Sequence, residues 1–88
     1  MKVIIIIEES HGFIGCAKDY KSSIRFLIKE NWLVDVDIWD EERHIWRSHI
    51  EILGENWANI IENQWNIEKF NEFFQESFYL YEEKVYED

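Results

Sequence analysis

Three histidines and a single cysteine are the side chains of this sequence that metal or nucleophilic chemistry would use. The spacing of His44 and His49 suits neither the i, i+4 ligand pair of a helical zinc site nor adjacent positions on one face of a strand. Cys16 and His11 could supply a thiolate and a base, but both lie in one expected hairpin, and the pattern specifies no third group to orient them. We therefore expect no metal site, and we expect Cys16 to be a small buried apolar side chain.

Carboxylates are too numerous for their pairing to indicate general acid and base catalysis. The chain holds 19 acidic residues, so pairs can be drawn almost anywhere in it. It has no glycine-rich phosphate loop, no nucleophile elbow and no lysine in a P-loop context. We predict a protein that is not an enzyme and that binds no cofactor; the alternative from another class is a small hydrolase built around a histidine and carboxylates.

Charge is distributed unevenly along the chain, whose formal net charge is −10 at pH 7. Residues 51–88 hold ten acids and two bases, whereas residues 1–50 hold nine acids and seven bases. A negative field of this kind repels nucleic acid and anionic lipid and attracts basic surfaces of other proteins. The expected partner is therefore a protein with a basic surface, with no direct binding to nucleic acid or to a membrane. Four bases come together near the first expected helix, where they balance nearby acids: Lys18, Lys21, Arg25 and Lys29.

The most regular row of carboxylates lies along an expected helix over residues 67–75. At 100° of rotation per residue, one side of this helix carries the apolar side chains of Ile67, Phe70, Phe73 and Phe74. Glu68, Glu72 and Glu76 fall on the opposite side, about 6 Å apart along the axis, which is close to the phosphate spacing of a nucleic-acid strand. The row suggests a nucleic-acid mimic that inhibits or modulates a basic nucleic-acid-handling partner. The alternative is the solvated side of a soluble helix.

A hairpin is expected over residues 34–47. Its first strand is indicated by the alternation of Val34, Val36 and Ile38 with Asp35, Asp37 and Trp39. A four-residue loop at 41–44 would pair Asp40 with Ile45 and Trp39 with Trp46. The pairing is expected to bury one set of apolar side chains, Val34, Val36, Ile38 and Ile45.

The other face of this hairpin is the second candidate binding surface. It would carry Trp39 and Trp46 together, beside Asp35 and Asp37. Two indoles next to carboxylates resemble a binding hot spot, and a basic groove on a partner would meet both the rings and the acids. The alternative is that a helix or another protomer covers the two rings.

The first strand is expected at Val3 to Ile7, an unbroken β-branched run with two apolar faces that both need cover. At a sheet edge such a run would be an aggregation hazard, so we place it centrally, with neighbouring strands on both sides. A turn leads into a second, antiparallel strand over residues 13–18, in which Gly15 indicates a bulge or a close approach. Asp19 is expected to cap a helix over residues 20–31.

The second half of the chain is expected to form three helices and a last strand. Ser48 and Glu51 have the spacing of a capping box, which predicts a short helix ending near Gly54. The remaining elements are helices over residues 55–63 and 67–75, the latter capped by Asn66, and a strand over residues 78–87.

The predicted order ββαββαααβ describes one α+β domain over residues 1–88, with helices packed on a mixed or antiparallel sheet of about five strands. The last strand pairs most economically with the first, as an outer neighbour. Five Trp, six Phe and four Tyr supply the dense core that so short a chain needs. A lone cysteine forms no internal disulfide, which favours a reducing cytoplasm, and the apolar run at 3–7 is too short for a signal peptide or a membrane span.

Several segments together resemble a known group of sequences. They are Met1-Lys2-Val3 with the isoleucines that follow, Glu8 to Gly12, Asp19-Tyr20, Glu30 to Leu33, Leu53 to Trp57, and Asn71 to Tyr81. On these segments the chain resembles, over nearly its whole length, a group of short acidic uncharacterised proteins from phages and mobile elements of Gram-positive bacteria. The resemblance implies a bacterial cytoplasmic setting and no particular activity. It favours an interaction protein, since small mobile-element proteins often bind and modulate host enzymes.

The leading hypothesis is a non-enzymatic interaction module that engages a basic partner through acidic and aromatic surface. A structural homodimer is an alternative compatible with it, in which a second copy completes the first strand or covers the tryptophan pair. The expected partner-binding residues are Asp35, Asp37, Trp39, Trp46, Glu68, Glu72 and Glu76.

Overall fold

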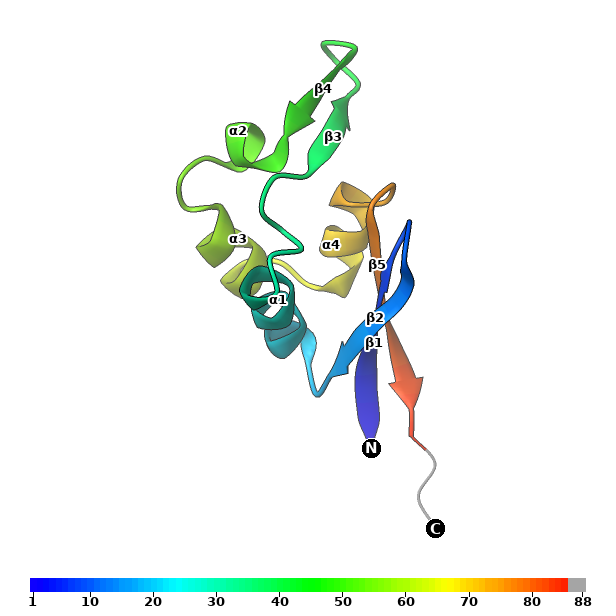
Figure 1. The fold of residues 1–88 in the computed structure, drawn as a ribbon. Helices are drawn as coiled ribbons and strands as arrows, with labels where there is room; N and C mark the ends of the chain where they lie inside the picture. Colours follow the sequence, from blue (N-terminus) through cyan, green and yellow to red (C-terminus); the bar gives the residue numbers. More distant parts are fainter. Residues whose placement is uncertain (86–88) are drawn as a thin grey trace.

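Five strands and four helices follow one another in residues 1–85, the part of the chain that this computed structural model describes (Figure 1). The predicted α+β class and the order ββαββαααβ are confirmed. The predicted extension of the last strand to Glu87 lies outside the described residues. The elements are β1 (Lys2–Glu8), β2 (Gly12–Ala17), α1 (Tyr20–Lys29), β3 (Asp37–Asp40), β4 (Ile45–Ser48), α2 (His49–Leu53), α3 (Trp57–Asn63), α4 (Ile67–Phe73) and β5 (Phe78–Lys84).

The strands divide between two antiparallel sheets. Three of them form a sheet in the order β2-β1-β5, so β1 lies at the centre and β5 is its outer neighbour, as predicted. β3 and β4 form a separate hairpin, which Figure 1 shows projecting at the end of the molecule opposite the N-terminus. The molecule is elongated, with Cα extents of 51 Å along its longest axis and 24 and 21 Å along the others.

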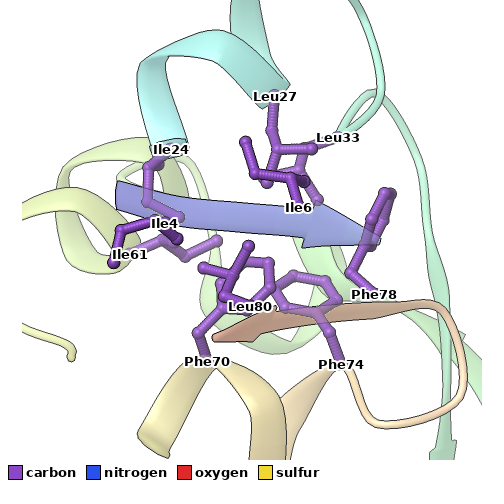
Figure 2. Packing of buried hydrophobic residues seen from close by; sticks show 10 residues of the cluster. All are labelled: Ile4, Ile6, Ile24, Leu27, Leu33, Ile61, Phe70, Phe74, Phe78 and Leu80. Carbon is purple, nitrogen blue, oxygen red and sulfur yellow. The ribbon is translucent and has the colours of Figure 1, made fainter. Parts of the chain in front are cut away.

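The hydrophobic core lies between one face of the three-stranded sheet and the helices. Ile4 and Ile6 project from β1 into this space, where Figure 2 shows side chains of α1 and α4 around them. Removing such apolar area from water contributes roughly 25 cal/mol per Å², which makes this cluster the main source of the fold's stability. The buried apolar residues are Ile4, Ile6, Ile24, Leu27, Leu33, Ile61, Phe70, Phe74, Phe78 and Leu80.

The opposite face of β1 is open, and the expectation that both faces of this strand are covered is wrong. Val3, Ile5 and Ile7 alternate with the buried isoleucines, are only half-buried, and do not pack against the core. The reason is topological: α1 and α4, which contact the three-stranded sheet, both lie on its other side (Figure 1).

Strand β2 contains both features that Gly15 led us to expect. Ile6 pairs with Gly15 but Ile7 pairs with Phe13, so Ile14 is the extra residue of a β-bulge. A Cβ atom at Gly15 would lie 2.7 Å from Cζ of Phe26, which shows that the helix α1 approaches the strand closely here. The glycine is therefore required by packing.

Three helices begin at the caps predicted for them. Side-chain oxygens of Asp19, Ser48 and Asn66 accept backbone N–H groups in the first turns of α1, α2 and α4, at 2.8, 3.1 and 2.9 Å. Gly54 follows α2 with φ of 82°, a conformation that favours glycine, so the predicted end of this helix is also confirmed.

The helix α4 ends at Phe73 rather than at Gln75. The N–H groups of Ser77 and Phe78 both donate to the carbonyl oxygen of Phe74, at 2.8 and 2.9 Å, and so close a turn into β5. This turn allows Phe74 and Phe78 to enter the core together. Glu76 lies in the turn, so the predicted continuous helical row of three carboxylates is wrong at its third member.

Candidate functional site

Asp40 organises the loop of the β3–β4 hairpin. Its Oδ1 accepts the N–H groups of Glu42 and Arg43 at 3.0 and 3.1 Å, and its Oδ2 accepts from the Arg47 guanidinium at 3.1 Å. The N–H of Arg43, followed by the bond from Arg47, holds the pKa of the Asp40 carboxyl below its usual value. The carboxylate thus fixes the loop conformation, in which His44 has φ of 55°.

The loop sets the predicted register and brings two indoles together. Trp39 pairs with Trp46, and their ring centroids are 5.5 Å apart in an edge-to-face arrangement. Such a pair contributes about 0.5 to 1.5 kcal/mol beyond its buried area. The rings are nevertheless 38% and 55% exposed, so the alternative in which a helix of this chain covers them is wrong.

The other face of the hairpin is less buried than predicted. Val36 and Ile38 are half-buried and pack against the core, but Val34 and Ile45 are exposed. Val34 precedes β3, which begins only at Asp37, and Ile45 lies next to the loop at the projecting end of the hairpin. The expected burial of Val34 and Ile45 is therefore wrong.

A groove runs between the hairpin and the end of α4. We call it the hairpin groove and define it by Asp37, Trp39, Glu41 and Trp46 of the hairpin, Phe73 at the end of α4, and Glu76 in the turn after it. A neighbouring hollow shares Trp39 and Glu41 and extends over Arg47, Lys69 and Glu72. The hairpin and the carboxylates after α4, predicted as two separate candidate sites, thus form one surface.

The predicted binding residues divide into those at this surface and those away from it. Asp37, Trp39, Trp46 and Glu76 line the hairpin groove, and Glu72 lines the neighbouring hollow. Asp35 and Glu68 are exposed but line neither. Sequence reasoning missed Glu41 and Phe73 as groove residues, because their proximity depends on how the hairpin is placed against α4.

In the described residues, the acidic side chains of the hairpin groove form no ion pair with a base. Within residues 1–85, no ion pair involves Asp37, Glu41 or Glu76, nor the other predicted acids Asp35, Glu68 and Glu72. Arg47 is instead engaged by Asp40 and Glu51, at 3.1 and 3.7 Å. Lys69 lies 5.8 Å from the ring centroid of Trp65. The hairpin groove therefore combines exposed aromatic surface with uncompensated negative charge.

The three histidines occupy separate environments. His11 is exposed, with Nδ1 2.5 Å from Oε2 of Glu8, and its ring lies against Trp32. His44 contacts the edge of Trp39 in the hairpin. His49 is fully buried at the start of α2. In the described residues, no group of three His, Cys, Asp or Glu side chains could hold a metal ion.

No pattern in the sequence predicts the buried environment of His49. Its Nδ1 accepts the N–H of Val36 at 3.1 Å, and its backbone N–H donates to the Val36 carbonyl at 2.9 Å. Its ring packs edge-to-face against Trp57, with centroids 4.7 Å apart, and contacts Phe74. Burial lowers the pKa of His49, although the Val36 carbonyl oxygen, 3.4 Å from Nδ1, opposes the shift. The residue therefore acts as a structural link between the hairpin and the core.

Cys16 is exposed, and the prediction that it is buried is wrong. It pairs with Ile5 on β1 and shares that residue's open side of the sheet. Side chains alternate along a strand, so placing Gly15 against Phe26 turns Cys16 outwards.

No helix in residues 1–85 is both long and apolar enough to cross a membrane. No protein-family model matches the chain, and neither a curated protein nor a solved structure is significantly similar to it.

Proposed function

We propose that this chain is a non-enzymatic interaction module that binds a basic surface of another protein through the hairpin groove. The observation that supports this most directly is the exposure of Trp39 and Trp46 beside Asp37, Glu41 and Glu76, none of which is paired with a base in the described residues. The separation of the three histidines supports a binding role over a hydrolytic one.

The groove offers a basic partner two kinds of contact. Arginine and lysine side chains can lie against an indole face while a carboxylate accepts their N–H groups. A contact of this kind is worth more where the aromatic rings exclude water, and the paired rings of Trp39 and Trp46 provide such a surface. The partner we propose is therefore a protein segment rich in arginine or lysine.

Inhibition of a nucleic-acid-handling enzyme is one form that this activity could take. Such enzymes carry basic grooves, and the resemblance to mobile-element proteins favours a host enzyme in a bacterial cytoplasm as the target. Glu76 lies in the turn after α4, so Glu68 and Glu72 are the two members of the predicted row that lie on the helix. The combined aromatic and acidic groove, rather than a phosphate-like row, is accordingly the surface we propose for contact.

The test begins with affinity capture from a native host, followed by mass spectrometry, to obtain the partner. A variant with Asp37→Lys, Glu41→Lys and Glu76→Lys should then lose capture, and Trp46→Ala should weaken it at least tenfold, because a central aromatic contact typically contributes about 2 kcal/mol or more. The matched control reverses Glu30, Glu55 and Glu68, which are exposed and outside the groove but change the net charge equally.

Equal loss of capture in the two charge-reversed variants would show that net charge alone attracts the partner, and would exclude the groove as the binding site. Unchanged capture by the groove variant would contradict the proposal outright. Circular dichroism of each variant confirms that the fold is retained, since all six substituted positions are exposed.

A further inference from the structure

Strand β3 has a free edge, and the hydrogen bonds of the hairpin show which backbone groups lie on it. In the described residues, β3 is hydrogen-bonded to β4 alone. The His49 N–H donates to the Val36 carbonyl at 2.9 Å, one pair beyond Asp37 and Ser48 in the register. Bonded and non-bonded pairs alternate in an antiparallel ladder, so Asp37 and Trp39 belong to non-bonded pairs. Their N–H and C=O groups therefore point away from β4, along the free edge.

The backbone groups on this edge have no partner within residues 1–85. No hydrogen bond outside the ladder involves the N–H or C=O of Asp37 or Trp39, and both residues are exposed. The two edges of the three-stranded sheet are less open, because the Asn71 amide occupies the outward groups of Leu80 on β5, and β2 has its β-bulge at Ile14. The free edge of β3 is thus a template for a further strand.

The free edge of β3 faces the end of α4. Ile38 and Trp39 project from opposite faces of β3, yet both line the hairpin groove as well as the neighbouring hollow. Phe73 and Gln75 also line both. The groove and the hollow therefore meet at this edge, on the side of the hairpin towards α4 (Figure 1). A strand added there would have one face towards the groove and the other towards the hollow.

The two faces of an added strand would meet different chemistry. Side chains of directly paired residues share a face, so the residues opposite Asp37 and Trp39 would project into the groove. The charged residues that line the groove are all acidic, namely Asp37, Glu41 and Glu76. The residue between the two would project towards Ile38 and the hollow, where Arg47 and Lys69 accompany acidic side chains. Bases at alternate positions, separated by an apolar residue, therefore fit this edge best.

We propose that the basic segment of the partner binds as an extended strand antiparallel to β3, with arginine or lysine at alternate positions. This strand geometry rests on the proposed function, which supplies the basic partner. An extended main chain offers donors and acceptors to the free groups of Asp37 and Trp39, whereas a helix uses its own internally. Antiparallel pairing is the more stable arrangement per residue. It also places a base against the indole of Trp39, with the groove carboxylates around it.

Titrations with a synthetic peptide, acetyl-Thr-Val-Arg-Val-Arg-Val-Thr-amide, test this geometry. Methylating the backbone nitrogens of its two arginines removes the N–H groups that would face β3, and should weaken binding by roughly tenfold or more. The matched control is methylated at its first two valines, whose N–H groups would point away from β3, and it should bind as the parent does. An isomer with adjacent arginines should bind several-fold more weakly, although its charge is the same.

Hydrogen exchange followed by NMR locates the contact on the protein. The N–H groups of Asp37 and Trp39 should exchange rapidly in the free protein and become protected several-fold when the parent peptide is bound. Those of Trp46 and Ser48 are the internal control, because these residues form the other half of the same non-bonded pairs and direct their N–H groups away from β3. Their exchange should change much less.

Equal binding of the two methylated peptides, or unprotected N–H groups at Asp37 and Trp39, would overturn the strand geometry. If the peptides bind equally but the variant with Asp37→Lys, Glu41→Lys and Glu76→Lys binds none of them, the proposed function stands and only the strand geometry fails. The same holds if the parent peptide does not bind at millimolar concentration while the groove variant still loses the host partner. A groove variant that keeps both peptide and partner would instead contradict the proposed function.

Discussion

His49 is held in a neutral form by its contacts. Its Nδ1 lies 3.1 Å from the Val36 nitrogen and 3.4 Å from the Val36 carbonyl oxygen, and its Nε2 is buried without a hydrogen-bond partner. Protonation would create a charge among the rings of Trp57 and Phe74, and it would also let Nδ1 donate to the Val36 carbonyl oxygen. Burial lowers the pKa of His49, and it outweighs the bond to the Val36 carbonyl and the charge of Asp35, which both favour the charged form.

This environment makes the stability of the fold depend on pH below about 6.5, the value for an unperturbed histidine. The pKa of His49 is lowered by folding, so as the pH falls the unfolded chain takes up its proton first and the free energy of unfolding decreases. The decrease continues until the pH reaches the lower pKa of the folded protein, with a slope of at most about 1.4 kcal/mol per pH unit for one proton. Urea unfolding between pH 7.5 and 5 measures it.

The comparison variant is His49→Gln, which should be less stable than the wild type at pH 7.5 but should show a flatter dependence over this range. His44→Gln changes an exposed ring and should keep the wild-type slope. Asp19 and Asp40, whose carboxyl pKa values are lowered mainly by backbone hydrogen bonds, contribute stability that is lost at more acid pH. A slope unaffected by His49→Gln would contradict our account of the buried ring.

Individual elements are predictable where neighbours in sequence determine them. The caps at Asp19, Ser48 and Asn66 depend on a side chain and an N–H group three or fewer positions away, and all three were predicted. The pairing of Trp39 with Trp46 follows from the length of one loop. Apart from the pairing of β5 with β1, contacts between distant segments were not predictable, because the pattern of apolar residues does not specify how elements are placed against each other.

Three outcomes show this limit. The early end of α4 depends on the entry of Phe74 and Phe78 into a common core. The convergence of Glu76 with the hairpin depends on that turn. The exposure of Cys16 depends on the contact of Gly15 with a helix that comes later in the chain. The local sequence thus predicted that each element exists, whereas tertiary packing determined the shape of the candidate site.

Asn71 illustrates a contact between elements that no local pattern predicts. It lies on α4, and its Nδ2 donates to the Leu80 carbonyl at 2.7 Å while its Oδ1 accepts the Leu80 N–H at 2.8 Å. Leu80 is on β5, an edge strand of the three-stranded sheet, so the amide satisfies backbone groups that would otherwise be unpaired. One side chain thereby fixes the helix to the strand.

Replacing this amide by a carboxylate should weaken the link strongly. Asn71→Asp keeps an acceptor for the Leu80 N–H, but it removes the donor and places negative charge against the Leu80 carbonyl oxygen. We expect a loss of about 2 kcal/mol in the free energy of unfolding, measured with urea at pH 7. Asn63→Asp is the matched control at an exposed position, and it should cost much less. Equal losses would show that the bonds to Leu80 contribute little.

The whole molecule presents two surfaces of different chemistry on one small core. The hairpin groove is anionic and aromatic, whereas the open side of the three-stranded sheet is mostly apolar, with Phe13 and Tyr79 exposed and Glu83 beside Val3. They belong to separate sheets, and the helical core lies with the three-stranded one (Figure 1). Changes in solvent that affect charge should therefore act differently on the two surfaces, even though a single folded unit carries both.

Salt should weaken the association with a basic partner. At an ionic strength of 0.01 M charges interact over roughly 30 Å, and at 0.15 M over roughly 8 Å, which is short compared with a molecule 51 Å long. Raising salt over this range should weaken partner capture, because it screens the attraction of a basic segment to Asp37, Glu41 and Glu76.

Partner capture at both ionic strengths measures this effect. The control variant that reverses Glu30, Glu55 and Glu68 keeps the three groove acids, so its capture should weaken with salt as that of the wild type does. Capture that salt does not weaken would mean that apolar contacts to Trp39 and Trp46, rather than the carboxylates, hold the partner.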